Sequence, residues 1–308
     1  MATGIGAAAA GILVFKRRTA GSPTASRTEQ SAQTSTSGHR GGSGSPLVLL
    51  HGVGGNWRVW TPVLKRLEAH HDVFAPTMLG HGGAAEFAAG VVPSVDALAD
   101  GIEAMLDSAG VDRAHIVGNS LGGWVALELA RRGRASSVVV FSPAGAWRSQ
   151  WRIYSRVAGI RMIVAMIALG APRADAIASQ PWMRWLLLSS QVAYPMRVDP
   201  ELLAADIRAA GNAPGVQPLL RALPLRQLEP LPADRTYPIR VVWGDADRIL
   251  PYDQFGAPMI ELLPGAEVIR QKGVGHIPMS DDPLAVAQRI LEVTTAVDEE
   301  QFPRATSG

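Results

Sequence analysis

The chain has 308 residues, 47% of them hydrophobic, which is enough for one large α/β core with an appendage. It contains no cysteine, which excludes disulfides, thiolate metal sites and cysteine nucleophiles and leaves serine, carboxylates and histidine for any chemistry. The net charge is +2, but the first 45 residues hold five basic residues against one acid, so the remaining residues carry a formal charge of −2. A nearly neutral domain gives no electrostatic reason to expect a nucleic acid as partner.

Residues 1–45 differ in texture from the rest of the chain. An apolar run over residues 2–15 is followed by three basic residues, and residues 19–45 are rich in Ser, Thr and Gly without apolar periodicity, which predicts a disordered linker. The apolar run is shorter than the roughly 20 residues that cross a bilayer, and a secretory signal carries its positive charges before its apolar run. We favour a tail on a cytoplasmic protein, with weak membrane association of the N-terminal segment as the second interpretation and export as the third.

From Pro46 onward, apolar runs of strand length alternate with amphipathic stretches of helix length. This alternation predicts an α/β fold in which helices flank a mostly parallel β-sheet. The expected strands are residues 47–51, 71–76, 114–118, 137–142, 239–244 and 267–271. The expected helices are residues 57–69, 94–109, 121–132 and 283–296, with Ser94 as an N-cap and Gly133 closing the third.

The alternation stops after Ala146, where Trp, Met and Arg accumulate in helix-like segments. A set of inserted helices that covers one edge of the sheet explains this stretch better than an independent domain does. The expected order is a tail and linker (1–45), the first part of the core (46–145), a helical lid (146–231), the second part of the core (232–297) and a C-terminal tail (298–308).

One serine stands out because of its surroundings. Ser120 lies in Gly-Asn-Ser-Leu-Gly, which fits G-x-S-x-G between an expected strand and an expected helix, where the motif forms a sharp turn that lifts the serine oxygen above the sheet. The glycines at 118 and 122 remove side chains where strand and helix crowd each other. A serine hydroxyl needs a base to become nucleophilic, so the pentapeptide alone is weak evidence.

The later strands supply a base and an acid. Asp247 follows the strand at 239–244, and His276 follows the last strand. The order Ser, Asp, His then places three side chains at carboxyl ends of parallel strands, where α/β sheets build their sites. Asp245 is a second candidate for the acid, two positions before Asp247.

With these motifs in order, the chain resembles the α/β-hydrolase superfamily, and within it the esterase-like and lipase-like members with a lid. The resemblance rests on Gly-Asn-Ser-Leu-Gly, His-Gly-Val-Gly-Gly from residue 51, Trp-Gly-Asp-Ala-Asp from residue 243 and Gly-Val-Gly-His from residue 273. It implies a lid after the sixth strand of the family's sheet. It also implies Ser120 as nucleophile, His276 as general base and then acid, and Asp247 as the orienting carboxylate, in preference to Asp245.

The resemblance further implies an oxyanion hole formed by the backbone N–H groups of Leu121 and Val53. His51, just before the oxyanion turn, is expected to brace that loop by hydrogen bonds. None of the seven histidines has the spacing of a metal site, so we expect neither a metal nor another cofactor.

The identity of the nucleophile limits the class of reaction that the protein could catalyse. Family members that open epoxides or remove halides resemble one another in carrying an aspartate at the position of Ser120, so a serine implies acyl transfer, most commonly on a carboxylic ester. Tryptophans and methionines of the lid suggest an adaptable apolar roof for a small to medium apolar substrate, or a seal onto the sheet. The residues expected there are Trp147, Trp151, Trp182, Trp185, Met162, Met166, Met183 and Met196.

Two alternatives stay open. Gly-Asn-Ser-Leu-Gly-Gly and Asp-Arg-Ile-Leu-Pro also resemble hydrolases that cleave carbon–carbon bonds in meta-cleavage products of aromatic rings, although the loop after His51 and Ile277 depart from that pattern. A member of the fold that binds a small ligand without turnover is the other alternative. The oligomeric state is left open.

Overall fold

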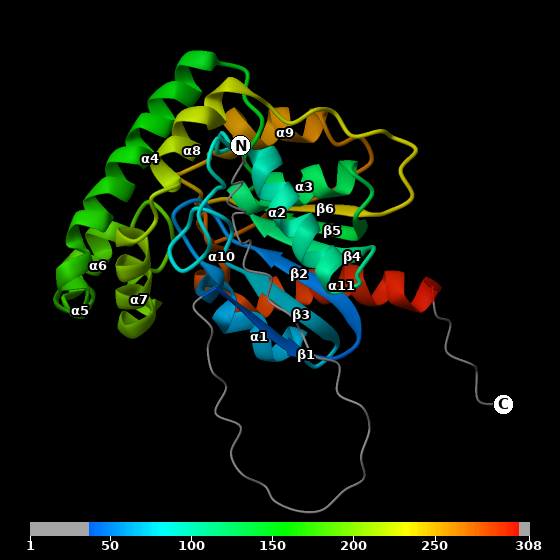
Figure 1. The fold of residues 1–308 in the computed structure, drawn as a ribbon, viewed down its shortest axis with the longest axis horizontal. Helices are drawn as coiled ribbons and strands as arrows, with labels where there is room; N and C mark the ends of the chain where they lie inside the picture. The colour runs from blue at the N-terminus through cyan, green and yellow to red at the C-terminus, as the bar shows by residue number, and fades with distance from the viewer. Residues whose placement is uncertain (1–36, 302–308) are drawn as a thin grey trace, which may run out of the picture. The chain divides into compact units, whose positions relative to one another are not determined.

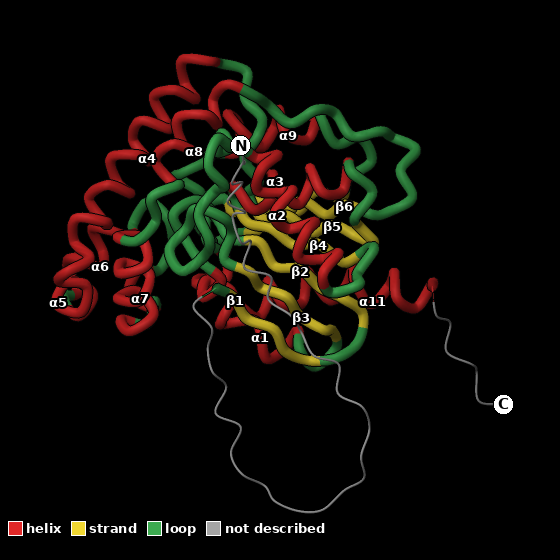
Figure 2. Tube along the Cα trace, in the orientation of Figure 1, coloured by secondary structure: helices red, strands yellow, loops and turns green. Residues whose placement is uncertain are grey.

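The computed structural model describes residues 37–301, and its centre is a sheet with strands in the order β1-β3-β2-β4-β5-β6-β7. All neighbouring strands are parallel except β1 and β3, which are antiparallel. Figure 2 shows these strands in yellow, surrounded by helices. The strands are β1 (Gly38–Gly42), β2 (Ser45–Leu50), β3 (His71–Pro76), β4 (Ala114–Asn119), β5 (Ala135–Phe141), β6 (Ile239–Gly244) and β7 (Glu267–Gln271). The predicted α/β class and its six parallel strands are confirmed.

Alternate side chains of each strand serve two separate cores. Val48 and Leu50 pack under helices α2 (Val95–Ser108) and α3 (Leu121–Arg131). Leu47 and Leu49 pack on the other face under α1 (Thr61–Leu67) and α11 (Pro283–Gln301). Because both faces are covered, the strands read as continuous apolar runs in the sequence. Two short helices, α9 (Ala257–Glu261) and α10 (Pro278–Asp281), complete the core.

Strand β1 corrects the predicted boundary of the linker at residue 45. It pairs with the edge strand β3, and Arg40 donates to the Asp72 carboxylate at 2.7 Å while its guanidinium lies over the Phe74 ring. Gly42, at φ 82°, turns the chain toward β2 at a point where a Cβ would lie 2.2 Å from a backbone oxygen. A polar, glycine-rich strand forms here because the backbone ladder stabilises it without an apolar face. The predicted apolar segment at 2–15 lies outside the described residues.

The C-terminal boundary also needs a correction. The predicted helix at 283–296 is longer in the structure, where α11 continues to Gln301, so the predicted tail from residue 298 begins too early. The helix continues because Asp298 of α11 has partners in the sheet. Its carboxylate accepts hydrogen bonds from Ser45 and His115. Residues 302–308 of the predicted tail lie outside the described residues.

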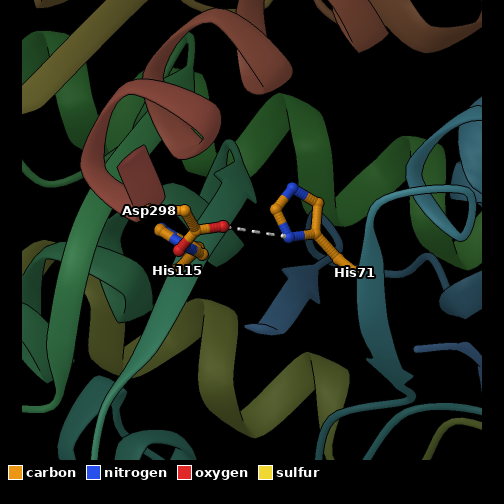
Figure 3. Close-up of side chains that lie close together, drawn as sticks. All are labelled: His71, His115 and Asp298. Carbon is orange, nitrogen blue, oxygen red and sulfur yellow. Dashed lines mark hydrogen bonds and ion pairs between the residues drawn. The ribbon is translucent and has the colours of Figure 1, made fainter. Parts of the chain in front are cut away.

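These bonds belong to a polar network at the amino ends of the strands, of which Figure 3 shows His71, His115 and Asp298. Asp298 accepts from His115 Nε2 at 3.0 Å and from the Ser45 hydroxyl at 2.7 Å, and that hydroxyl lies 2.8 Å from His71 Nδ1. Thr294 lies 2.8 Å from His71 Nε2. With both imidazoles neutral every donor meets an acceptor, so the network fastens α11 to the sheet.

Five helices are inserted between β5 and β6, at one side of the sheet in Figure 1. They are α4 (Gln150–Gly170), α5 (Ala174–Ser179), α6 (Pro181–Leu188), α7 (Pro200–Gly211) and α8 (Val216–Ala222). Helices α5, α6 and α7 share a small apolar cluster of their own. Helices α4 and α8 add side chains to the core that α2 and α3 cover. Helices α4 and α8 therefore share buried side chains with the main core.

Candidate active site

The turn between β4 and α3 places Ser120 in an unusual conformation. Its φ of 56° and ψ of −117° lie outside the common regions for a residue with a side chain. Close packing enforces the turn: a Cβ on Gly118 would lie 2.2 Å from the Gly122 oxygen, and one on Gly122 would lie 2.2 Å from the Leu50 oxygen. The Ser120 N–H also donates to Phe141 of β5 at 3.0 Å. The chain therefore holds a strained, mostly buried serine at the end of the strand.

Asp247 and His276 meet beside this turn. The His276 Nδ1–H donates to the Asp247 carboxylate at 2.7 Å, and the other oxygen of that carboxylate accepts the backbone N–H groups of Ile249 and Leu250. The carboxylate is thus fixed before it bonds the ring. With the proton on Nδ1, the Nε2 atom of His276 is left as a base.

The structure brings Asp247, and not Asp245, to the histidine. Asp245 is exposed and accepts the backbone N–H of Gly273 at 2.8 Å. Asn119, next to the serine, donates its side-chain amide to the His276 carbonyl at 2.8 Å. This bond ties the loop that carries the histidine to the strand that carries Ser120.

Ser120 and His276 both line a cavity of about 230 Å³. Among the described residues, no hydrogen bond joins the Ser120 hydroxyl to the imidazole. Catalytic hydrogen bonds are often long in a site without substrate, so sharing one cavity is the relevant geometry here.

Two residues whose backbone N–H groups were predicted as donors also line this cavity. Val53 and Leu121 line it, and within residues 37–301 neither N–H donates a hydrogen bond. The loop after β2 passes close to the serine, since a Cβ on Gly52 would lie 3.4 Å from the Ser120 Cβ. The loop that carries Val53 therefore lies next to Ser120.

His51 holds this loop in place. Its Nδ1–H donates to the Gly52 carbonyl at 2.8 Å, and its Nε2 accepts the backbone N–H of Met78 at 2.9 Å. Burial, with a smaller contribution from neighbouring His81, lowers the pKa of His51 to about 3. The ring is therefore neutral at physiological pH and braces the loop.

The inserted helices add a carboxyl group that sequence analysis missed. Asp206 of α7 lines the cavity, and Asn56 of the loop after β2 donates to it at 2.7 Å. Burial raises the pKa of Asp206 to about 6, against the lowering effects of Asn56 and Arg58. The sequence contained one signal for this residue, because Asp206 is an acid among the apolar residues Leu202, Leu203 and Ile207 of one helix. These three residues also line the cavity.

The predicted roof is wrong for all but one of these tryptophans and methionines. The predicted seal onto the sheet is wrong for the six that are exposed, Trp151, Met162, Met166, Trp182, Trp185 and Met196. Of those eight residues only Trp147 lines the cavity, packed edge to face on Trp124. The inner wall is instead aliphatic, and from α4 it includes Ile153, Val157, Ile160, Val164 and Ile167. Helix α4 is apolar on both faces, and the face that carries its tryptophan and methionines points away from the cavity.

One cluster outside the cavity has the composition of a metal site. His71, His115 and Asp298 offer ligand atoms within 4.8 Å of one another. All four ring nitrogens, however, already have hydrogen-bond partners in the network at the amino ends of the strands. Hydrogen bonding therefore accounts for the cluster without an ion.

The fold is that of the α/β hydrolases. In agreement, residues 47–289 match the model of the alpha/beta hydrolase family, and the chain belongs to that family. Its relatives carry more than one named activity. Epoxide hydrolase EphH of Mycobacterium tuberculosis is 38% identical over 214 residues, which cover 67% of this chain and 95% of the relative.

Two further comparisons concern another sequence relative and a solved structure with a similar fold. The 2-hydroxymuconate semialdehyde hydrolase of Pseudomonas sp. CF600 is 36% identical over 129 residues, which cover 40% of this chain and 45% of the relative. A thermophilic esterase from Thermogutta terrifontis has a structure with a TM-score of 0.66 at 21% identity, covering 84% of this chain and 93% of the esterase. The protein therefore belongs to a family of hydrolases whose members differ in the bond that they cleave.

Proposed function

We propose that this protein hydrolyses carboxylic esters through an acyl-enzyme intermediate. The observation that supports this most strongly is the bond of 2.7 Å between Asp247 and His276 at the wall of a cavity that also contains Ser120. A nucleophile, a base and an orienting acid are the three parts that serine catalysis requires.

Each residue has one task. His276 takes the proton of the Ser120 hydroxyl as the serine oxygen attacks the ester carbonyl, and Asp247 stabilises the imidazolium. The N–H groups of Val53 and Leu121 stabilise the negative oxygen of the tetrahedral intermediate. His276 then gives the proton to the leaving alcohol. Water, activated by the same histidine, releases the acid and restores Ser120.

A serine nucleophile also argues against epoxide opening, the activity named for the relative from M. tuberculosis. Attack by Ser120 on an epoxide carbon would form an ether on the enzyme. An ether has no carbonyl carbon for water to attack, so the enzyme would not turn over. A carboxylate nucleophile avoids this problem because it forms an ester. Acyl transfer is therefore the reaction that Ser120 completes.

Carbon–carbon cleavage is the second candidate, because a relative is a 2-hydroxymuconate semialdehyde hydrolase and two arginines, Arg58 and Arg156, line the cavity. A ring-fission product carries a carboxylate that such cations would bind. Against it, Asp206 lies close enough to Arg58 to feel its charge, and the rest of the wall is mainly apolar. The balance favours an uncharged ester.

A panel of p-nitrophenyl esters of increasing acyl length tests the proposal. We expect turnover of short and medium chains and a decline for long chains, because the cavity has only about 230 Å³. A fluorophosphonate should label the protein once, on Ser120, and the label should be absent from Ser120→Ala. Turnover of a ring-fission dienoate without turnover of any ester would replace this proposal by the second candidate.

A further inference from the structure

Helix α4 is apolar on two opposite faces, which an ordinary surface helix is not. Its inner face lines the cavity. Its outer face exposes large apolar side chains at helical spacing, among them Trp151 at 78% and Leu169 at 82% exposure. The segment Gln150–Ser179 is, by length and composition, apolar enough to cross a membrane, yet only 11% of its most apolar window is buried.

Helix α6 of the same insertion also exposes large apolar side chains. We define the docking surface as the exposed residues Trp151, Tyr154, Met162, Met166 and Leu169 of α4 together with Trp182, Trp185 and Leu186 of α6. Both helices belong to the insertion that Figure 1 places at one side of the sheet. Exposed apolar side chains in such number mark an interaction site in a protein whose core is otherwise well buried.

The charges in the segment that carries the docking surface are mainly positive. Residues 150–188 contain five arginines and a single acid, Asp175, which is paired with Arg208 at 2.8 Å. Within the described part of the chain, the guanidinium groups of Arg152 and Arg173 form no ion pair. The surface therefore presents apolar and aromatic side chains next to uncompensated positive charge.

We propose that the docking surface binds an anionic phospholipid bilayer, with α4 lying in the plane of the membrane interface. Tryptophan and tyrosine favour that interface, and arginines attract the phosphates. The helix lies on the membrane and does not cross it, because its inner face forms the wall of the Ser120 cavity. The assignment does not depend on which bond the enzyme cleaves.

A second copy of the chain is the competing occupant of this surface. In a two-fold dimer through α4 the same arginines would face one another, and like charges at an interface weaken binding. An anionic lipid surface has the complementary charge. The observations therefore favour lipid over a second copy.

Sedimentation of the full chain with vesicles tests the proposal. We expect binding to equal parts of phosphatidylcholine and phosphatidylglycerol, weaker binding to phosphatidylcholine alone, and loss of binding at high salt. The variant Trp151→Gln/Met162→Gln/Leu169→Gln should bind at least about tenfold more weakly, because three apolar side chains no longer enter the interface. The matched control Val92→Gln/Leu284→Gln changes two exposed apolar residues outside the insertion and should bind as the unmodified chain does.

Two results would overturn the proposal. One is unchanged vesicle binding by the triple variant, which would move any membrane contact to another part of the chain; deletion of residues 1–36 then asks whether that part is the N-terminal segment. The other is a dimer of the unmodified chain that the triple variant converts to a monomer, without vesicle binding by either. Circular dichroism confirms that the triple variant is folded before either result is interpreted.

Discussion

The sheet and the inserted helices differ in how far they bury their apolar residues. In β2, Leu47 to Leu50 are completely buried between helices on both faces, whereas α4 buries one apolar face against the cavity and leaves the other exposed. The core carries Ser120, Asp247 and His276. The insertion forms one wall of the cavity and exposes the docking surface. Substitutions in the two regions should therefore have different effects. Those in the core should change turnover and stability at acid pH, whereas those in the insertion should change vesicle binding or cause small changes in the free energy of unfolding.

The largest effect should come from the core residue Ser120. Ser120→Ala removes the nucleophile with a sterically mild change, so we expect ester turnover to fall about a thousandfold or more while the melting temperature changes little. Steady-state kinetics and thermal unfolding measure the two quantities. Unchanged turnover in a preparation free of contaminating esterase would show that the chemistry does not depend on this serine.

The next effect should separate two acids of the core. Asp247→Asn leaves a group that cannot stabilise imidazolium, so kcat should fall about a hundredfold or more at neutral pH. Asp245→Asn is the matched control, since Asp245 contacts the Gly273 backbone and not the histidine. If Asp245→Asn proved the more damaging, the orienting acid would have to be reassigned.

The amino ends of the strands should govern acid stability. Burial, followed by repulsion from His115, lowers the pKa of His71 from 6.5 to about 4. A lowered folded-state pKa means that the neutral ring stabilises the fold above pH 6.5 and that this stability is lost as the pH falls from 6.5 through 4. For His71 alone the loss amounts to about 3 kcal/mol.

The variant His71→Gln isolates this contribution. It removes one titrating group, so unfolding free energies measured by denaturant between pH 7 and 4 should fall less steeply than in the unmodified chain. It also removes bonds to Ser45 and Thr294, so the variant should start from a lower stability at pH 7. If the free energy of unfolding fell equally steeply with pH in the two proteins, His71 would not control the loss of stability at acid pH.

Much of the core could be predicted from the sequence, for physical reasons. Strands buried on both faces give apolar runs that stand out, and residues after such runs, Ser120, Asp247 and His276 among them, must gather at one edge of a parallel sheet. Strand β1 escaped notice because its stability comes from pairing with β3 and not from an apolar pattern.

The insertion was harder to predict. Residue type alone does not tell which face of α4 meets the cavity when both faces are apolar. Its tryptophan and methionines were therefore expected to form a roof or to seal onto the sheet, and Ile153 and its neighbours were not predicted to line the cavity. Asp206 was missed because its place in the cavity depends on how α7 docks against the loop of Asn56. Such packing between distant segments leaves little trace in a single sequence.

The smallest effect should come from Asp206, the carboxyl group that the insertion adds to the cavity. Burial raises its pKa from 3.8 to about 6, so the fold favours the protonated acid, and the stability that protonation contributes is lost as the pH rises from 3.8 through 6. At pH 7.5 the carboxylate is ionised in a mostly apolar wall. Asp206→Asn keeps the shape and an oxygen that accepts from Asn56, and we expect it to raise the unfolding free energy by about 1 kcal/mol at pH 7.5 and by much less at pH 4.5. Denaturant unfolding at the two pH values measures the difference. An equal gain at both would mean that Asp206 does not titrate between them, and a loss at pH 7.5 would mean that the charged hydrogen bond to Asn56 outweighs the cost of burying the carboxylate.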